Sequence, residues 1–181
     1  PFSGYKKVYD PRGTGEGRGI FTSVKLGKTI AVVGNSVLAI TQTYNLQNIQ
    51  QTSVTLINTI ESYNGDVYIT ENDASEIAIS DNINIYIYNY KNSTFGKASI
   101  NFKPGYICFI DGYFISPSRD TNQWRLSNLN HGLQWPDDES HRSTLQTKPD
   151  NVQAAIRMPG KGNLILLFGS TVTEQWYDIG A

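Results

Sequence analysis

The 181-residue sequence is poor in the residues that most often carry chemistry, with one cysteine, one methionine and two histidines. The single cysteine, Cys108, cannot form an internal disulfide, so nothing implies an oxidising compartment. The longest apolar runs, Tyr106–Ile110 and Leu164–Phe168, are far shorter than the roughly 20 residues of a membrane-spanning helix. An excess of one charge is also lacking, because 15 basic and 16 acidic residues leave a net charge of −1. This balance argues against a free-standing nucleic-acid-binding domain, which typically carries a basic excess.

Residues that favour β-strands are abundant. The chain contains 19 Ile, 15 Thr, 9 Val and 11 Tyr, whereas Ala, Leu and Met together number 20. β-branched side chains lose rotamer freedom on a helix but pack well on a pleated sheet. Asn and Gly, which tolerate the positive φ angles of tight turns, number 16 each. The composition therefore predicts an all-β fold with many short strands.

The order of these residues predicts one β-rich region after an opening segment. Residues 1–19 are rich in Gly and Pro, and residues 20–181 contain about four hairpin units. In these units an apolar strand leads into the turn, which is typical of a strand buried on both faces. A strand of alternating apolar and polar residues leads out of the turn, which is typical of a strand buried on one face. The four predicted turns are Gly34-Asn35, Asp81-Asn82, Asp111-Gly112 and Gly169-Ser170.

The mean spacing of these turns, about 45 residues, is close to the length of a four-stranded propeller blade. We therefore expect a β-propeller in preference to a sandwich. Four units do not comfortably close a ring of the usual size. The expected architecture is accordingly an open arc, or a fragment of a larger propeller, within a longer chain.

Two groups of residues are weighed as sites of chemistry. His131 and His141 flank the acidic residues Asp137, Asp138 and Glu139, a combination that could hold a divalent metal or transfer protons. The surrounding segment, residues 129–149, is polar and predicts a long surface loop. Solvated side chains are therefore favoured over a metal site.

The second group consists of carboxylates beside the apolar hairpins. Asp111 and Glu174 are the best placed for a glycosidase-like pair, although nothing in the sequence pairs them. Cys108 lies in an apolar run, which favours a structural thiol over a reactive one. Residues 13–19 are rich in glycine but do not have the spacing of a nucleotide-binding loop. We therefore predict no catalytic residue, no cofactor and no metal.

The C-terminal third carries the most distinctive motifs. A Pro-Asp step at Pro149-Asp150 precedes an apolar strand that ends in Phe168-Gly169. A Thr-x-Glu-x-aromatic strand then leads to Gly180. The residues of interest are Pro149, Asp150, Phe168, Gly169, Glu174, Trp176, Tyr177 and Gly180.

In order and spacing, these motifs resemble those of the packaged-DNA stabilisation proteins of short-tailed bacteriophages, the tail hub or plug proteins of the Salmonella-phage type. Upstream, Asp111-Gly112-Tyr113-Phe114 and Asn122–Ser127 also fit the order of that family, as does Arg18-Gly19. The opening Phe2-Ser3-Gly4 departs from it, because Ser3 stands where Pro is usual. The resemblance covers residues 105–181 well and the first hundred residues only in order and style.

The resemblance implies a β-propeller in a structural virion protein that is not an enzyme. Such a protein sits below the portal and its adaptor in the phage tail, closes the tail channel and retains packaged DNA. The implied partners are further copies of the chain in a ring, by resemblance a hexamer, together with the portal-adaptor ring and a distal tail needle or fibre. Assembly would take place in the host cytoplasm. No membrane is implied.

The resemblance also suggests roles for single residues. Phe168, Trp176 and Tyr177 are expected in the core of the last blade. Pro149-Asp150 would fix the start of the last strand pair, with Asp150 bonded to its own backbone two residues on. The first 28 residues carry a net charge of +4 and could contact packaged DNA non-specifically, although a role at an interface rim or in solubility is commoner for such residues. The alternatives are a carbohydrate-active propeller, either glycosidase or glycan binder, and a propeller adaptor that binds protein partners.

Overall fold

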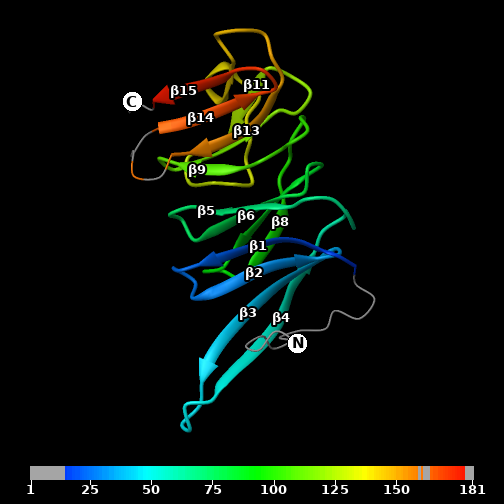
Figure 1. Ribbon diagram of the computed structural model, residues 1–181, viewed down its shortest axis with the longest axis vertical. Helices are drawn as coiled ribbons and strands as arrows, with labels where there is room; N and C mark the ends of the chain where they lie inside the picture. The colour runs from blue at the N-terminus through cyan, green and yellow to red at the C-terminus, as the bar shows by residue number, and fades with distance from the viewer. Residues whose placement is uncertain (1–14, 159, 161–163, 178–181) are drawn as a thin grey trace. The chain divides into compact units, whose positions relative to one another are not determined.

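The protein is an all-β structure, as the composition predicts. The computed structural model describes residues 15–158, 160 and 164–177, which form fifteen strands in four antiparallel sheets (Figure 1). The helical content of these residues is one 3₁₀ turn, η1 (Glu139–His141). No helix within the described ranges has the length and hydrophobicity needed to cross a membrane. The chain divides into two compact units, residues 1–64 and residues 65–181.

The first unit is built on a single sheet whose strands lie side by side in chain order. Its predicted turn, Gly34-Asn35, joins the two middle strands, and Gly34 has the positive φ of 54° that such a turn needs. Arg18, on the first strand, is buried and donates hydrogen bonds to the carbonyl oxygens of Gly34 and Ser62. The strands are β1 (Gly17–Ser23), β2 (Lys28–Val33), β3 (Ser36–Tyr44) and β4 (Gln50–Thr59).

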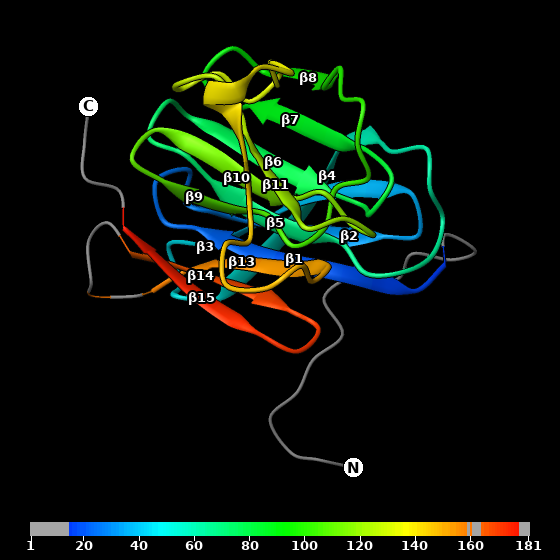
Figure 2. The same cartoon turned by 90° about the horizontal axis from the view of Figure 1, so that it is seen from above.

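The second unit contains three sheets, again with sequential strands paired as neighbours. Figure 2 shows the three strands of the last sheet lying side by side. The first sheet comprises β5 (Tyr68–Glu71), β6 (Glu76–Ser80), β7 (Ile85–Asn89) and β8 (Thr94–Lys97). The second comprises β9 (Cys108–Ile110), β10 (Tyr113–Pro117), β11 (Gln123–Leu126) and β12 (Arg142–Thr144). The third comprises β13 (Val152–Arg157), β14 (Leu164–Gly169) and β15 (Thr173–Tyr177).

The β9–β12 sheet is buried on both faces, which explains the uninterrupted apolar run at Tyr106–Ile110. Successive side chains of a strand point to opposite faces. On β10, Phe114 packs with residues of the β5–β8 sheet, and its neighbour Ile115 packs with residues of the β13–β15 sheet. On β9, Phe109 faces the first of these clusters, and Ile110 faces the second. A strand with sheets on both sides needs apolar residues at consecutive positions.

A hairpin is present at each of the four predicted turns. The turns at Gly34-Asn35 and Asp111-Gly112 have two residues, whereas those between β6 and β7 and between β14 and β15 are longer. Both Asp111 and Gly112 have positive φ, 44° and 89°, as in the tightest hairpin turns. The predicted long loop at residues 129–149 is wrong in part, because it contains η1 and β12. Strand β12 forms by pairing with β11, and that long-range contact is not visible in local sequence.

Candidate functional site

The C-terminal motif residues gather in and around the β13–β15 sheet, where carboxylates hold the loops. One oxygen of Asp150 (Oδ2) accepts hydrogen bonds from the backbone N–H groups of Thr171, at 2.6 Å, and Val172, at 3.1 Å. Its other oxygen accepts one from the N–H of Asn151. These bonds, that of Thr171 first, hold the pKa of Asp150 below its usual value.

The predicted partner of Asp150, its own backbone two residues on, is therefore wrong. The main contact spans from the start of β13 to the β14–β15 turn, and it depends on the tertiary fold. Gly169 belongs to the same arrangement, since a Cβ atom there would collide with the Asp150 carboxylate. The Phe-Gly step thus ends in glycine because the Asp of the Pro-Asp step needs that space. Pro149 itself is exposed.

Glu174 on β15 is the second carboxylate that holds a loop in place through hydrogen bonds. It is buried, and its Oε1 atom accepts hydrogen bonds from the backbone N–H groups of Gln146, at 2.7 Å, and Thr147, at 2.5 Å. Its Oε2 atom accepts the indole N–H of Trp176 at 2.8 Å. Burial alone would raise the pKa of Glu174, but the hydrogen bonds from Thr147, Trp176 and Gln146 outweigh burial and lower it. The carboxylate is therefore held ionised, and both of its oxygens are engaged.

The aromatic residues of the motif do not all lie in the core. Trp176 is half-buried and packs edge-on against Trp124 of β11, with ring centroids 5.3 Å apart. Phe168 is also half-buried. The prediction that Tyr177 is core is wrong, because 65% of this side chain is exposed. Strand alternation places Tyr177 on the face opposite to Glu174 and Trp176. Gly180 lies outside the described residues.

Asp111 and Glu174 are not joined into a pair by any contact in the described structure. Asp111 is exposed in the β9–β10 turn. Glu174 lines an open hollow of about 530 Å³ together with β15 and residues 146–147, and Asp111 is not among the lining residues. A glycosidase acid also needs a raised pKa, whereas that of Glu174 is lowered.

The acidic–histidine segment is likewise held by local and structural bonds. Asp138 caps η1 and accepts hydrogen bonds from the Ser140 side chain and His141, which lower its pKa to about 2. The Ser140 hydroxyl and the Asp138 carboxylate both meet Nδ1 of His141, whereas a catalytic triad places them on opposite ring nitrogens. Among the described residues, no group of three His, Cys, Asp or Glu is arranged to hold a metal ion.

Asp137, the third acid of that segment, has an arginine partner that the sequence did not reveal. Arg125 on β11 is buried and donates from Nη1 to Asp137 Oδ1, and Asn101 donates to the other oxygen at 2.8 Å. The Arg125 bond is the main reason why the pKa of Asp137 is lowered. The Arg125 guanidinium also lies 5.7 Å from the centre of the Phe102 ring. These contacts tie the segment after β11 to the residues before β9.

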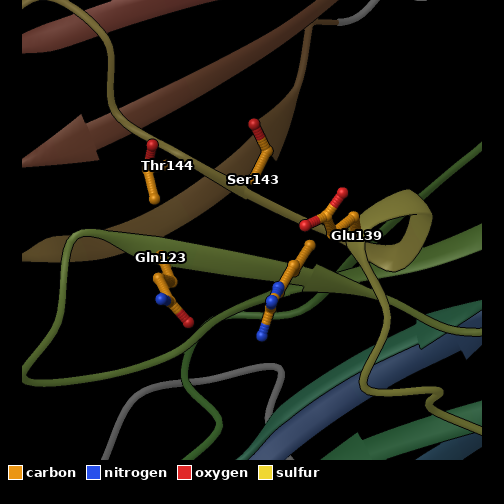
Figure 3. A pocket seen from close by; sticks show the side chains of 5 residues that line it. Gln123, Glu139, Ser143 and Thr144 are labelled. Carbon is orange, nitrogen blue, oxygen red and sulfur yellow. The ribbon is translucent and has the colours of Figure 1, made fainter.

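A shallow pocket lies beside this segment (Figure 3). Gln123 comes from β11, Ser143 and Thr144 come from β12, and Glu139 comes from η1, with Arg142 also in the lining. Its volume, about 230 Å³, is below the roughly 300–1,000 Å³ of typical small-molecule sites.

Cys108 is buried, and burial raises its pKa to about 12, so it is an un-ionised thiol. These features give no nucleophile–base arrangement.

Arg18 is one of the basic residues that give the first 28 positions their net positive charge, but it is not available for contact with DNA. In the structure its guanidinium is buried and bonded to Gly34 and to both the carbonyl and the hydroxyl of Ser62. Lys6, Lys7 and Arg12 lie outside the described residues.

Comparisons with known proteins identify a fold relationship and no family. No family model and no curated protein matches the sequence. The chain is similar to one in the crystal structure of the mitotic checkpoint complex, with TM-score 0.58 and 15% identity, over 94% of this chain and 49% of that chain. It therefore spans about half the length of that chain, whose fold is propeller-like. A second likeness, to Myxococcus xanthus glutaminyl cyclase, has TM-score 0.43 and 10% identity over 83% of this chain and 68% of that one.

Proposed function

We propose that this chain is an arc of a β-propeller in a structural protein of a phage tail. It would act as a hub or plug below the portal and adaptor, close the tail channel and retain packaged DNA, without enzymatic activity. Its partners would be copies of itself in a hexameric ring, the portal-adaptor ring and a distal needle or fibre protein.

The propeller part of the proposal is supported by the order of the strands. In the second unit, β9 lies against both β5 and β13, so that the first strands of three successive sheets are neighbours. Tyr106, just before β9, forms a parallel bridge with Ala154 of β13. First strands that lie together and run the same way are typical of the inner strands around a propeller axis. The likeness to a propeller-like solved structure supports the same architecture.

The observation that carries the tail assignment is the way the resembling motifs connect. Asp150 of the Pro-Asp step bonds the turn that follows Phe168-Gly169, and Glu174 of the last strand bonds the loop before Pro149. The separate motifs are thus parts of one braced sheet. A sheet with both loops fixed by ionised carboxylates suits a rigid ring component better than an enzyme, because no carboxylate of the motif has an oxygen free for chemistry.

Two alternatives have less support. A carbohydrate-active enzyme needs two carboxylates in one site, and Asp111 and Glu174 have no contact with each other. A propeller adaptor for protein partners would share the fold, and it differs from a tail hub in forming no ring of its own.

Electron microscopy of the purified full chain tests the proposal. We expect closed rings with a central hole, and non-specific binding of double-stranded DNA that weakens steeply as salt increases. Particles without rings at all protein concentrations would contradict the assignment. So would glycan turnover that disappears in Asp111→Asn or Glu174→Gln.

A further inference from the structure

Among the described residues, the outer part of the first unit is a two-stranded ribbon without a third strand. The last residue of β3 that β2 reaches is Ile40, opposite Thr29. Beyond it, residues 41–44 of β3 pair with residues 50–53 of β4, and neither segment pairs with another strand of the described structure. Figure 1 shows this β3–β4 ribbon (residues 41–53) running well past the ends of β1 and β2. Two-stranded ribbons are only marginally stable alone in water, so a ribbon of this kind gains from a further strand.

The ribbon is nevertheless well specified at its tip. The side-chain oxygen of Asn45 accepts hydrogen bonds from the N–H groups of Gln47, at 3.0 Å, and Ile49, at 2.9 Å. Asn48 takes the positive φ of 57° that closes the turn. The β3–β4 connection is therefore an ordered hairpin turn. It fixes the position of β4, the exposed edge strand of the ribbon.

Strand β4 lacks the features that normally protect an outer strand from pairing. Natural edge strands are short, charged, interrupted by proline or bulged. In the second unit, β8 has four residues and ends in Lys97, and β12 has three and begins with Arg142. Strand β4 has ten residues with no charge, glycine or proline. Its one bulge lies at Ile57, near the end of the strand, and leaves Gln50–Leu56 regular.

The charge pattern indicates what kind of strand would pair there. Residues 29–60 contain no acidic or basic side chain, although 17% of the whole chain is charged. The same region presents exposed apolar side chains, namely Tyr44, Leu46, Ile49 and Leu56. A nucleic acid or a charged partner would find no complementary charge along this edge. A second copy of the edge would meet no like-charge repulsion and would cover its own apolar residues with equivalent ones.

We propose that β4 pairs antiparallel with β4 of a second copy of the chain, with Ser53 at the twofold axis. The regular stretch Gln50–Leu56 has Ser53 at its centre, so this register uses its full length, roughly 24 Å at about 3.4 Å per residue. Alternate backbone groups of β4 face away from β3 and provide the bonds. The contact closes on itself and is separate from the head-to-tail contacts that a ring requires, so it does not depend on the tail assignment.

Cysteine scanning of the full chain tests the register. We expect rapid disulfide-linked dimers from Ser53→Cys, and much slower ones from Gln51→Cys and Thr55→Cys, which lie on the same face but away from the axis. The natural Cys108 is buried and leaves the background low. Equal cross-linking at all three positions would overturn the register and the pairing with it.

Sedimentation measurements test the contact itself. We expect a dimer whose dissociation constant is on the order of micromolar, because a single pair of seven-residue strands should bury less than the roughly 1,200–2,000 Å² of stable complexes. The variant Ser53→Lys/Thr55→Lys should raise that constant at least about tenfold, since it adds the charges that protect natural edges. Thr94→Lys, on the exposed start of β8, is the matched control and should leave the dimer unchanged.

The other outcomes also decide the matter. A monomer at every concentration overturns the proposal. If its β4 amides are then protected from hydrogen exchange, another segment of the same chain covers the edge. Closed rings that dissociate in the lysine variant would assign β4 to the ring contact and overturn the twofold arrangement. Rings that persist alongside loss of the twofold pair would uphold this proposal and the tail assignment together.

Discussion

The outer strands of the two units differ in length, charge and exposure, although both units are built from β-branched and aromatic residues. In the second unit, β8 and β12 are short and each contains a charged residue, and two clusters of apolar residues are buried between neighbouring sheets. In the first unit, β4 is long and uncharged, and apolar residues remain at the surface. β-branched and aromatic residues form strands in both places. Whether they become core depends on a second sheet being there to cover them.

The units also differ in how their loops are fixed. In the second unit, the ionised carboxylates of Asp150 and Glu174 accept hydrogen bonds from backbone N–H groups. In the first unit, the buried guanidinium of Arg18 donates hydrogen bonds to carbonyl and hydroxyl oxygens. A loop that presents N–H groups needs an acceptor, which is a carboxylate at Asp150 and Glu174 and a neutral amide oxygen at Asn45, whereas a loop that presents carbonyl groups needs a donor.

The largest expected effect separates core from surface apolar residues. Phe114→Ala should destabilise the second unit by about 4 kcal/mol, because its side chain is fully buried between two sheets. Leu56→Ala, on the exposed edge, should change stability by less than about 0.5 kcal/mol. Urea denaturation of both variants at low protein concentration measures the difference. Similar losses would contradict the contrast between the units.

A smaller loss of stability is expected on removal of the buried Glu174 carboxylate. Glu174→Ala leaves the N–H groups of Gln146, Thr147 and Trp176 without their acceptor and should cost about 3 kcal/mol. Glu174→Gln keeps one acceptor oxygen and should cost about half as much. The same denaturation measurement, with exchange protection of the Gln146 and Thr147 amides, tests this. Full protection in the alanine variant would show that the carboxylate does not hold the loop.

Acid should produce the mildest and most local change. The folded pKa values of Asp137, Asp138, Asp150 and Glu174 lie below their usual values. Their ionised forms therefore stabilise the fold above the unfolded pKa, and this contribution is lost as the pH falls through the folded pKa, from about 4.5 towards about 2. Hydrogen exchange in this range should increase first at residues 146–147 and 171–172. Residues 29–60, which have no acidic or basic group, should respond least, and a uniform response would contradict this account.

Much of the local structure is predictable from sequence, because turns and strand alternation depend on neighbouring residues. The Gly, Asn and Asp residues of the four turns predict them. Local sequence does not predict strand β12, because a three-residue strand carries almost no local signal and forms only against β11. Nor does it predict the Arg125–Asp137 contact, because the two residues are twelve positions apart and meet only through the fold.

The motif residues illustrate the same division. The order of short motifs points to Asp150 and Glu174, but it does not predict their hydrogen-bond partners, which lie 21 and 28 residues away. The resemblance places Tyr177 in the core of the last blade. In the structure, the alternation of β15 turns Tyr177 outward, to the face opposite to Glu174, which points inward to the loop that it binds.

Sequence alone determined that the chain forms short antiparallel strands, because β-propensity and turn chemistry act over a few residues. Only the tertiary structure decided which apolar strands are covered, which carboxylates hold loops in place and which strand edge has no paired neighbour in the described structure. These outcomes depend on contacts between residues far apart in the chain, and a local pattern does not specify them.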